Sequence, residues 1–191
     1  MAPTRILVFA GSIRSGALSA RLAALAAKEL ALTEADVTHV SLADYPLPIY
    51  DGDLEENQGI PENATKLARM IAANQGVFIA TPEYNHSLPP LLKNAIDWVS
   101  RHRHTGSLPF RRRIYAIGST SDGAIGGARA QIDLRKVLMT AVGGIILPDK
   151  IEISRAQDAF DESGELIDER QAKLLKTICR NLVDVAARLT D

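Results

Sequence analysis

The stretch RILVFAGSIRSGALSARLAALAAKEL, residues 5–30, decides the fold class. Residues 5–12 form a short, almost continuous apolar run, which is typical of a parallel strand that is buried on both faces. After a loop with two glycines, leucine and alanine recur three and four residues apart from Leu18 to Leu30, which predicts an amphipathic helix. A strand that leads directly into a helix is the repeating unit of α/β folds.

The same alternation continues along the rest of the chain. Strand-like runs are predicted at residues 37–42, 76–81, 114–118 and 145–147, and helical spacing at residues 60–71, 88–99, 134–142 and 175–189. Because every step between strands passes through a helix, the strands pair in parallel. The sequence therefore predicts an α/β fold, a flavodoxin-like three-layer αβα sandwich with a five-stranded parallel sheet in the order 2-1-3-4-5. No linker or repeat interrupts it, so residues 1–191 are expected to form one domain.

Composition excludes several classes of protein. The 22 Lys and Arg against 23 Asp and Glu leave a net charge of −1, without the basic surplus of a nucleic-acid binder. The single cysteine, Cys179, excludes an internal disulfide framework and is expected in the core on the last helix. The longest uncharged apolar-rich run has 12 residues, whereas a membrane span needs about 20. We therefore expect a cytoplasmic protein with neither a nucleic acid nor a membrane as partner.

A polar loop at residues 11–19 joins the first strand to the first helix. It offers two glycines, several hydroxyls and Arg14 at a helix N-terminus, a combination that suits a phosphate group. The same residues also fit a serine-rich helix cap with Arg14 in solvent. Neither of two better-known phosphate loops matches, because Ala17 stands at the lysine position of a Walker A loop and Ile13 at the second glycine of GxGxxG.

Two more polar loops leave the same predicted sheet edge, at residues 81–87 and 119–127. Pro82, Tyr84 and Asn85 make the first one stiff, so it could support a flat heterocycle or form a plain turn, with Ser87 as N-cap of the next helix. The second loop has hydroxyls and three glycines and fits either a ligand-binding or a flexible surface loop. A phosphate site beside a platform for a flat ring, with no nucleophile, is what a flavin requires.

Other candidate sites are weaker. His102 and His104 could bind a metal, but no acidic or sulfur ligand is close in sequence, so no metal is expected. His86 could donate a proton or lie in solvent. Five arginines form a basic cluster that is either a solvated face or a site for a nicotinamide phosphate or an acidic substrate: Arg101, Arg103, Arg111, Arg112 and Arg113. Residues 149–165 are expected to be an exposed connection or an oligomer contact.

Four motifs resemble those of the NADPH-dependent FMN reductase family, which includes bacterial chromate and quinone reductases and azoreductase-like proteins. They are GSIRSG at residues 11–16, LPIYDGD at 47–53, TPEYN at 81–85 with LKNAIDWVSR at 92–101, and GGARAQ at 126–131 with Leu134 and Arg135. The resemblance runs in register over residues 5–148. It implies a single FMN-binding domain with non-covalent FMN, in cytoplasmic homodimers or homotetramers. It also implies ping-pong hydride transfer from NADPH or NADH through FMN to small-molecule acceptors: quinones, free flavin, azo compounds or metal oxyanions such as chromate.

Carried over by position, the resemblance assigns ten residues to FMN. The phosphate would be held by Ser12, Arg14 and Ser19, together with the amides of Leu18 and Ser19. The isoalloxazine would be lined by Pro82, Glu83, Tyr84 and Asn85. Its other edge would be closed by Ser121 and Gly123. No side chain is assigned a catalytic role, because FMN carries the chemistry. The chain departs from the family at Ala17, usually serine, and at Ser19, usually asparagine. Losing one hydroxyl contact to phosphate would cost about 1 kcal/mol.

Two hypotheses compete with an FMN-dependent NAD(P)H oxidoreductase that reduces quinones. A non-enzymatic electron carrier of the same fold would typically be strongly acidic, and the net charge of −1 argues against one. A regulatory or scaffold protein would bind flavin weakly, and Ala17 is the only residue that hints at this. NADPH oxidation with a quinone separates the first hypothesis from the other two, and FMN content separates those two from each other.

Overall fold

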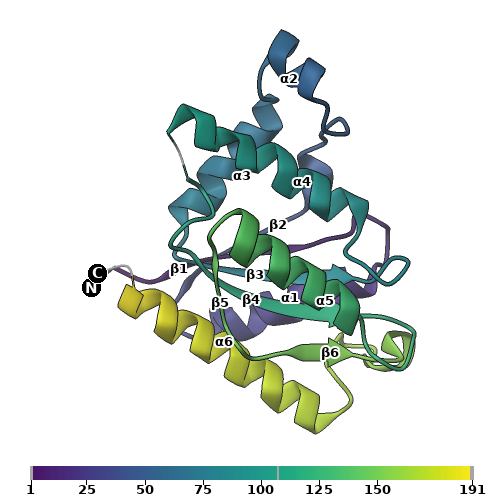
Figure 1. The fold of residues 1–191 in the computed structure, drawn as a ribbon. Coiled ribbons are helices and arrows are strands. Elements are labelled where there is room, and N and C mark those ends of the chain that lie inside the picture. The colour runs from purple at the N-terminus through teal and green to yellow at the C-terminus, as the bar shows by residue number, and fades with distance from the viewer. Residues whose placement is uncertain (1, 107, 190–191) are drawn as a thin grey trace.

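A computed structural model describes residues 2–106 and 108–189 and shows a parallel sheet between two layers of helices (Figure 1). The sheet has six strands, with the order β2-β1-β3-β4-β5 and β6 also paired to β4, so the predicted fold class and strand order are confirmed. All pairs are parallel, with Ile6 opposite Gly76 and Gly76 opposite Ile114. The strands are β1 Arg5–Ala10, β2 Asp36–Val40, β3 Gly76–Pro82, β4 Ile114–Thr120, β5 Ile145–Ile146 and β6 Ile151–Ile153.

The side chains of each central strand divide between two cores. Ile6 and Val8 of β1 face a core shared with α1 Leu18–Ala31 and α6 Glu169–Leu189. Leu7 and Phe9 face the second core, which is covered by α3 Glu62–Ala73, α4 Pro90–Ser100 and α5 Ala128–Lys136. Burial on both sheet faces explains why the strands read as continuous apolar runs.

The remaining helical segments are short. They comprise α2 Gly52–Gln58, the 3₁₀ turns Leu42–Asp44, Arg101–Thr105 and Ala156–Asp158, and the π-helical turn Val137–Ala141, which continues α5. The helix predicted at residues 134–142 is therefore the end of α5 and this wider turn. In the turn, the hydroxyl of Thr140 donates to the Lys136 carbonyl at 2.6 Å. Helix α2 was not predicted, because its sequence has no apolar periodicity.

The sixth strand corrects the expectation for residues 149–165. β5 pairs with the first half of β4 and β6 with the second half, as Ile114 opposite Ile145 and Gly118 opposite Ile151 show. Ile151 and Ile153 are buried, so this segment is not an exposed connection throughout. Pro148 and charged neighbours hide so short a strand from a pattern-based prediction.

Two smaller observations complete the fold. Cys179 is buried in the core as predicted, and burial raises the pKa of its thiol to about 12. Among residues 2–106 and 108–189, no helix has the length and apolar character needed to cross a membrane.

Candidate functional site

The first loop presents an open helix N-terminus. Gly11 donates its amide to the Ala80 carbonyl at 2.8 Å, which fixes the loop to β3. Helix α1 begins after Ala17, which provides no side-chain cap, and its first turn contains no acidic residue. The amides of Leu18 and Ser19 therefore receive no side-chain acceptor from this cap position, and the helix dipole adds positive potential there. This end of α1 is suited to an anion.

Ser19 supplies a second, independent indication of a ligand. Its side chain is 1% exposed, and its Oγ has no hydrogen-bond partner among the residues that the structure describes. A buried hydroxyl without a hydrogen-bond partner lowers the stability of the fold, and a polar group of a bound ligand would remove that cost. The phosphate of FMN would supply that acceptor beside the helix N-terminus, so the residues present fit this cofactor.

The three loops singled out in the sequence meet at one cavity of ≈ 130 Å³. This volume suits the phosphate end of a ligand, since pockets that enclose a whole drug-sized molecule measure about 300–1,000 Å³. Of the ten predicted site residues, Asn85 and Gly123 do not line it. The lining residues are Ser12, Arg14, Ala17, Leu18, Ser19, Pro82, Glu83, Tyr84, Thr120, Ser121 and Asp122. Thr120 and Asp122 were not predicted, although both flank Ser121 in a loop that the sequence had marked.

Asn85 shapes the second loop without lining the cavity. Tyr84 and Ser87 exchange both backbone hydrogen bonds at 3.0 Å, which closes a tight turn around Asn85 and His86. Asn85 has φ 48° and His86 has φ 64°, both in the left-handed region that costs most side chains energy. The turn holds Tyr84 at the cavity with its side chain partly exposed, at 45%.

Glu83 acts from this loop on a distant helix. Its side chain is 7% exposed, and its Oε2 accepts the amides of Arg129 at 3.0 Å and Ala130 at 3.2 Å. Oε1 lies 3.8 Å from the Arg129 guanidinium. Glu83 therefore caps the N-terminus of α5 across 46 positions of sequence. Because its carboxylate is engaged in this way, we assign it no proton-transfer role.

Ser87 is not the N-cap of α4, which corrects the sequence prediction. Helix α4 begins at Pro90 with Pro89 in the cap position and no side-chain cap. The Ser87 hydroxyl instead donates to Asp133 Oδ2 of α5 at 2.5 Å. This hydrogen bond, followed by that from Lys136, holds the pKa of Asp133 below its usual value. The second loop is thus tied to α5 at two points.

The third loop is anchored rather than flexible. Ser119 Oγ donates to the Gly126 carbonyl at 2.7 Å, and Gln131 Nε2 donates to the Ile151 carbonyl at 2.6 Å. Gly126 has φ 60°, and a Cβ there would lie 2.7 Å from the Glu152 carbonyl carbon, so only glycine fits. Ser121 Oγ accepts the amide of Gly123 at 3.0 Å, and Gly123 itself is exposed and does not line the cavity.

Comparison with known proteins places this chain in a family. The sequence model of the NADPH-dependent FMN reductase family matches residues 4–158. The chain belongs to that family. This confirms the resemblance read from the four motifs, and with it the FMN cofactor and the NAD(P)H-dependent oxidoreductase class.

Three relatives illustrate the range within the FMN reductase family. A quinone reductase of Escherichia coli K12 is 35% identical over 167 residues, covering 86% of both chains. A 2-hydroxy-1,4-benzoquinone reductase of a Burkholderia species is 36% identical over 175 residues, covering 91% of each chain. The solved structure of FerB, a flavoenzyme NAD(P)H:(acceptor) oxidoreductase from Paracoccus denitrificans, superposes with a TM-score of 0.80 at 31% identity over 97% of this chain and 98% of that one.

The arginines of the predicted basic cluster of this FMN reductase have different contacts and do not form one site. Arg101 donates to Glu55 at 2.7 Å and stands 5.4 Å from the centre of the Tyr50 ring. This ion pair lowers the pKa of Glu55. Arg113 donates to the Ala72 carbonyl at 2.6 Å, whereas Arg103 is exposed. None of these residues lines the cavity at α1.

Proposed function

We propose that this protein is an FMN-dependent NAD(P)H oxidoreductase that reduces quinones. The observation that carries the proposal is the buried Ser19 Oγ, which has no hydrogen-bond partner among the described residues and lies beside the uncapped N-terminus of α1 in the cavity where the three loops meet. Membership of the family supports the cofactor, and relatives named as quinone reductases support the acceptor class. Free flavin, azo compounds and metal oxyanions such as chromate are further candidate acceptors.

The proposed residue roles follow the loops. Ser12, Arg14 and Ser19 hold the FMN phosphate, with the amides of Leu18 and Ser19 at the start of α1. Pro82, Glu83, Tyr84 and Asn85 form the loop along the isoalloxazine, and Ser121 and Gly123 form the loop at its other edge. Their support is that eight of these ten line one cavity, while Asn85 and Gly123 shape two of the loops around it.

In this proposal the chain binds and orients, and it moves no proton. When bound, FMN would supply the atom that accepts hydride from the nicotinamide and passes it to the acceptor, and the proton that completes the reduction of a quinone would come from solvent. The hydrogen-bonded turn at residues 84–87 and the contacts of Glu83 with α5 keep the second loop in place, so little reorganisation is needed when ligands arrive.

We also propose that residues 1–191 form a single FMN-binding domain, that the protein is cytoplasmic, and that it is a homodimer or homotetramer. These three statements rest on the family to which the chain belongs and on the absence of any linker in the sequence.

The first test is the visible spectrum of the purified protein, with the released cofactor identified. We expect a flavin spectrum of FMN that bleaches on addition of NADPH or NADH under argon and returns when a quinone is added. FMN that is bound but not reduced would favour the electron carrier. A colourless protein that takes up no added FMN would overturn the proposal and favour the scaffold hypothesis.

A further inference from the structure

A second cavity adjoins the one at the start of α1, on the side of the edge strand β2. Its volume is ≈ 430 Å³, within the range of about 300–1,000 Å³ that is typical of small-molecule sites. Ser12 lines both cavities, so the two spaces meet at the first loop. The other lining residues are Ala10, Ala20, His39, Val40, Ser41 and Asp44, and none of these six belongs to the proposed FMN site.

The parallel register explains how this cavity forms. His39 lies opposite Val8 in the pairing of β2 with β1, and Val8 faces the core that is shared with α1. His39 is therefore on the α1 side of the sheet, because paired residues of neighbouring parallel strands point to the same face. β2 is the edge strand, and none of its residues 36–40 is buried. The end of β2 beside Ala20 of α1 is thus left hollow.

The strand order places this cavity beyond the phosphate position. In the order β2-β1-β3-β4, the loop after β1 is assigned to the FMN phosphate and the loops after β3 and β4 to its ring. β2 lies on the opposite side of β1. A ligand with its phosphate at α1 and its ring beside β3 and β4 therefore reaches the β2 cavity only through a group that is attached to the phosphate. FMN has no such group, because its phosphate is a terminal monoester.

The side chains around the β2 cavity suit a nucleoside. Asp44 is exposed, and within residues 2–106 and 108–189 its carboxylate forms no ion pair. In dinucleotide-binding α/β folds, an acidic side chain downstream of the first phosphate loop accepts hydrogen bonds from ribose hydroxyls. The protein around the His39 ring displaces water and lowers its pKa, so the imidazole is neutral at pH 7 and both donates and accepts a hydrogen bond. Ala10, Ala20 and Val40 supply apolar contact.

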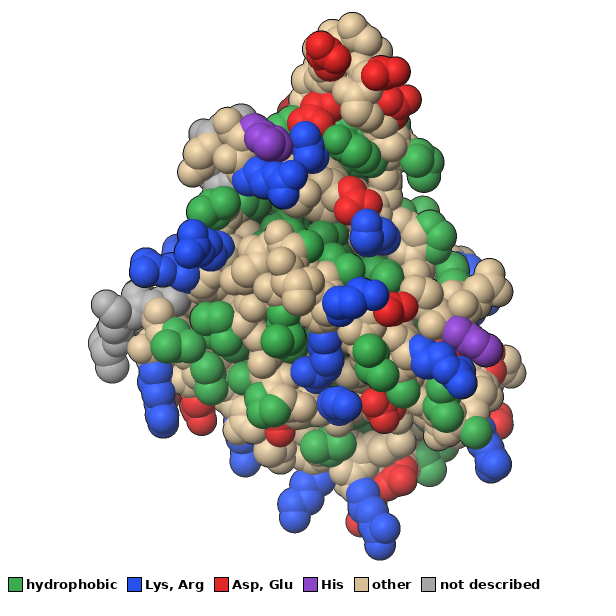
Figure 2. Space-filling view, viewed as in Figure 1, with side chains coloured by type: hydrophobic (Ala, Val, Ile, Leu, Met, Phe, Trp, Pro, Cys, Tyr) green, Lys and Arg blue, Asp and Glu red, His purple; other side chains and the backbone are tan. Residues whose placement is uncertain are grey.

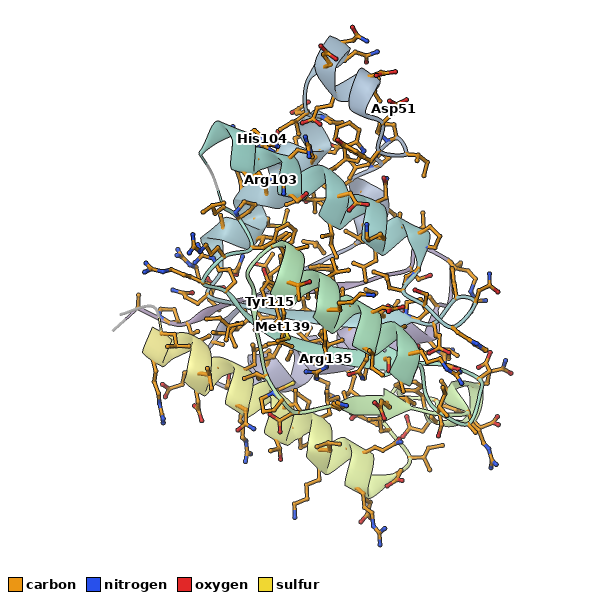
Figure 3. The ribbon with its side chains drawn as sticks, viewed as in Figure 1. Asp51, Arg103, His104, Tyr115, Arg135 and Met139 are labelled. Carbon is orange, nitrogen blue, oxygen red and sulfur yellow. The ribbon has the colours of Figure 1, made fainter. Side chains whose placement is uncertain are left out.

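The charges of the molecule disfavour an anionic group in this cavity. Neither lysine nor arginine is among its lining residues, whereas Arg14 lines the neighbouring cavity at α1. Figure 2 shows basic side chains at the end of α4, where Figure 3 places Arg103 and His104. That is the C-terminal end of α4, while the loop after β3 leads into its N-terminal end, so these cations lie away from the three loops. Phosphate charge is therefore best placed at the first loop, with an uncharged group beside β2.

We propose that the β2 cavity binds the adenosine part of FAD, so that this protein accepts FAD as well as FMN. The inference rests on the proposed function, because it takes the phosphate position at α1 as given. The flavin half occupies the same three loops with either cofactor. The diphosphate of FAD lies at Ser12 and Arg14, and the adenosine enters the β2 cavity, where its ribose hydroxyls donate to the Asp44 carboxylate.

Two variants and a matched control test the cavity. Asp44→Ala removes the acceptor for the ribose, and Ala20→Leu fills the space from α1 with another strong helix former. Asp36→Ala is the control, because Asp36 is an exposed aspartate at the opposite, amino-terminal end of β2. The flavin-free proteins are titrated with FMN and with FAD by fluorescence. The FMN-loaded proteins are assayed with NADH to obtain KM, since the nicotinamide cofactor also carries an adenosine group.

We expect the wild type to bind FAD with a Kd no more than 10-fold above that for FMN. Asp44→Ala and Ala20→Leu should each raise the ratio of the Kd for FAD to the Kd for FMN about 10-fold, and the control should keep the wild-type ratio. The KM for NADH should not change.

Three results would overturn the inference and leave the proposed function intact. They are a wild type that binds FMN but binds FAD more than 10-fold more weakly, variants with the wild-type ratio of the two Kd values, and variants that raise the KM for NADH instead. The last result would assign the cavity to the adenosine of the nicotinamide cofactor. A protein that binds neither flavin would overturn the proposed function itself, and the inference with it.

Discussion

Replacing Ser19 with alanine is expected to affect the FMN-free and FMN-bound forms in opposite directions. The hydroxyl is buried and has no partner among the described residues, and leaving such a group unsatisfied costs about 1–3 kcal/mol. Ser19→Ala should therefore leave the FMN-free protein as stable as the wild type or raise its Tm, by about 2–4 °C for each kcal/mol relieved. A hydrogen bond to an ionised phosphate contributes about 1.5–3 kcal/mol, so the Kd for FMN should rise about 10- to 100-fold.

Thermal unfolding of the FMN-free proteins and fluorescence titration with FMN measure both effects. Ser100→Ala is the matched control, because that hydroxyl donates to the Asp97 carbonyl at 2.7 Å on α4 and should not influence FMN affinity. If Ser19→Ala bound FMN within two-fold of the wild type, Ser19 would not be a phosphate ligand. A large fall in the Tm of the FMN-free variant would show that the hydroxyl has a partner within the chain. That result would contradict the view that Ser19 is left open for a ligand.

Three further predictions concern the same loops. Ala17→Ser adds a hydroxyl at the uncapped N-cap of α1, so the free energy of unfolding should rise by about 0.5–2 kcal/mol. If a titration showed that this variant binds FMN less tightly, the new hydroxyl would be competing with phosphate for the amides of α1. Glu83→Gln removes the charge at the N-terminus of α5 and should lower the Tm by a few degrees with kcat/KM changed less than 10-fold; a complete loss of turnover would contradict our view that Glu83 transfers no proton. Because the Ser87 hydroxyl lowers the pKa of Asp133 in the folded state, Ser87→Ala should be less stable than the wild type above about pH 4, and urea unfolding should show this difference disappearing as the pH falls through the lowered pKa. A difference that is independent of pH would mean that Ser87 acts through packing alone.

The fold could be predicted because strands that are buried on both faces have recognisable apolar sequences. A strand such as residues 76–81 is covered on both faces, so nearly every position is apolar and the run is visible without an alignment. β6 could not be found in this way, because only Ile151 and Ile153 of its three residues face a core and Glu152 lies between them. Its existence depends on pairing with Ser119, a contact that local sequence does not encode.

The site could be predicted as three loops but not as a set of contacts. The carboxyl ends of parallel strands share one edge, and this rule brought the loops after β1, β3 and β4 together. It did not reveal that Ser87 binds Asp133, because serine before two prolines has the same local pattern as a helix cap. Nor did it separate Asn85, which shapes a turn, from Tyr84, which lines the cavity, since both belong to one motif.

Ligand preference at this site follows from which polar groups the protein leaves unpaired. Glu83 lines the cavity and accepts the first amides of α5, so this part of the wall is already bonded within the chain. At α1 the pattern is reversed, since Ala17 provides no cap and Ser19 Oγ has no partner in the described residues. A ligand gains most where such groups are left open, because elsewhere it must first displace an existing hydrogen bond. We therefore expect the cavity to bind an anionic end group at α1, beside a second loop whose Glu83 carboxylate is already bonded within the chain.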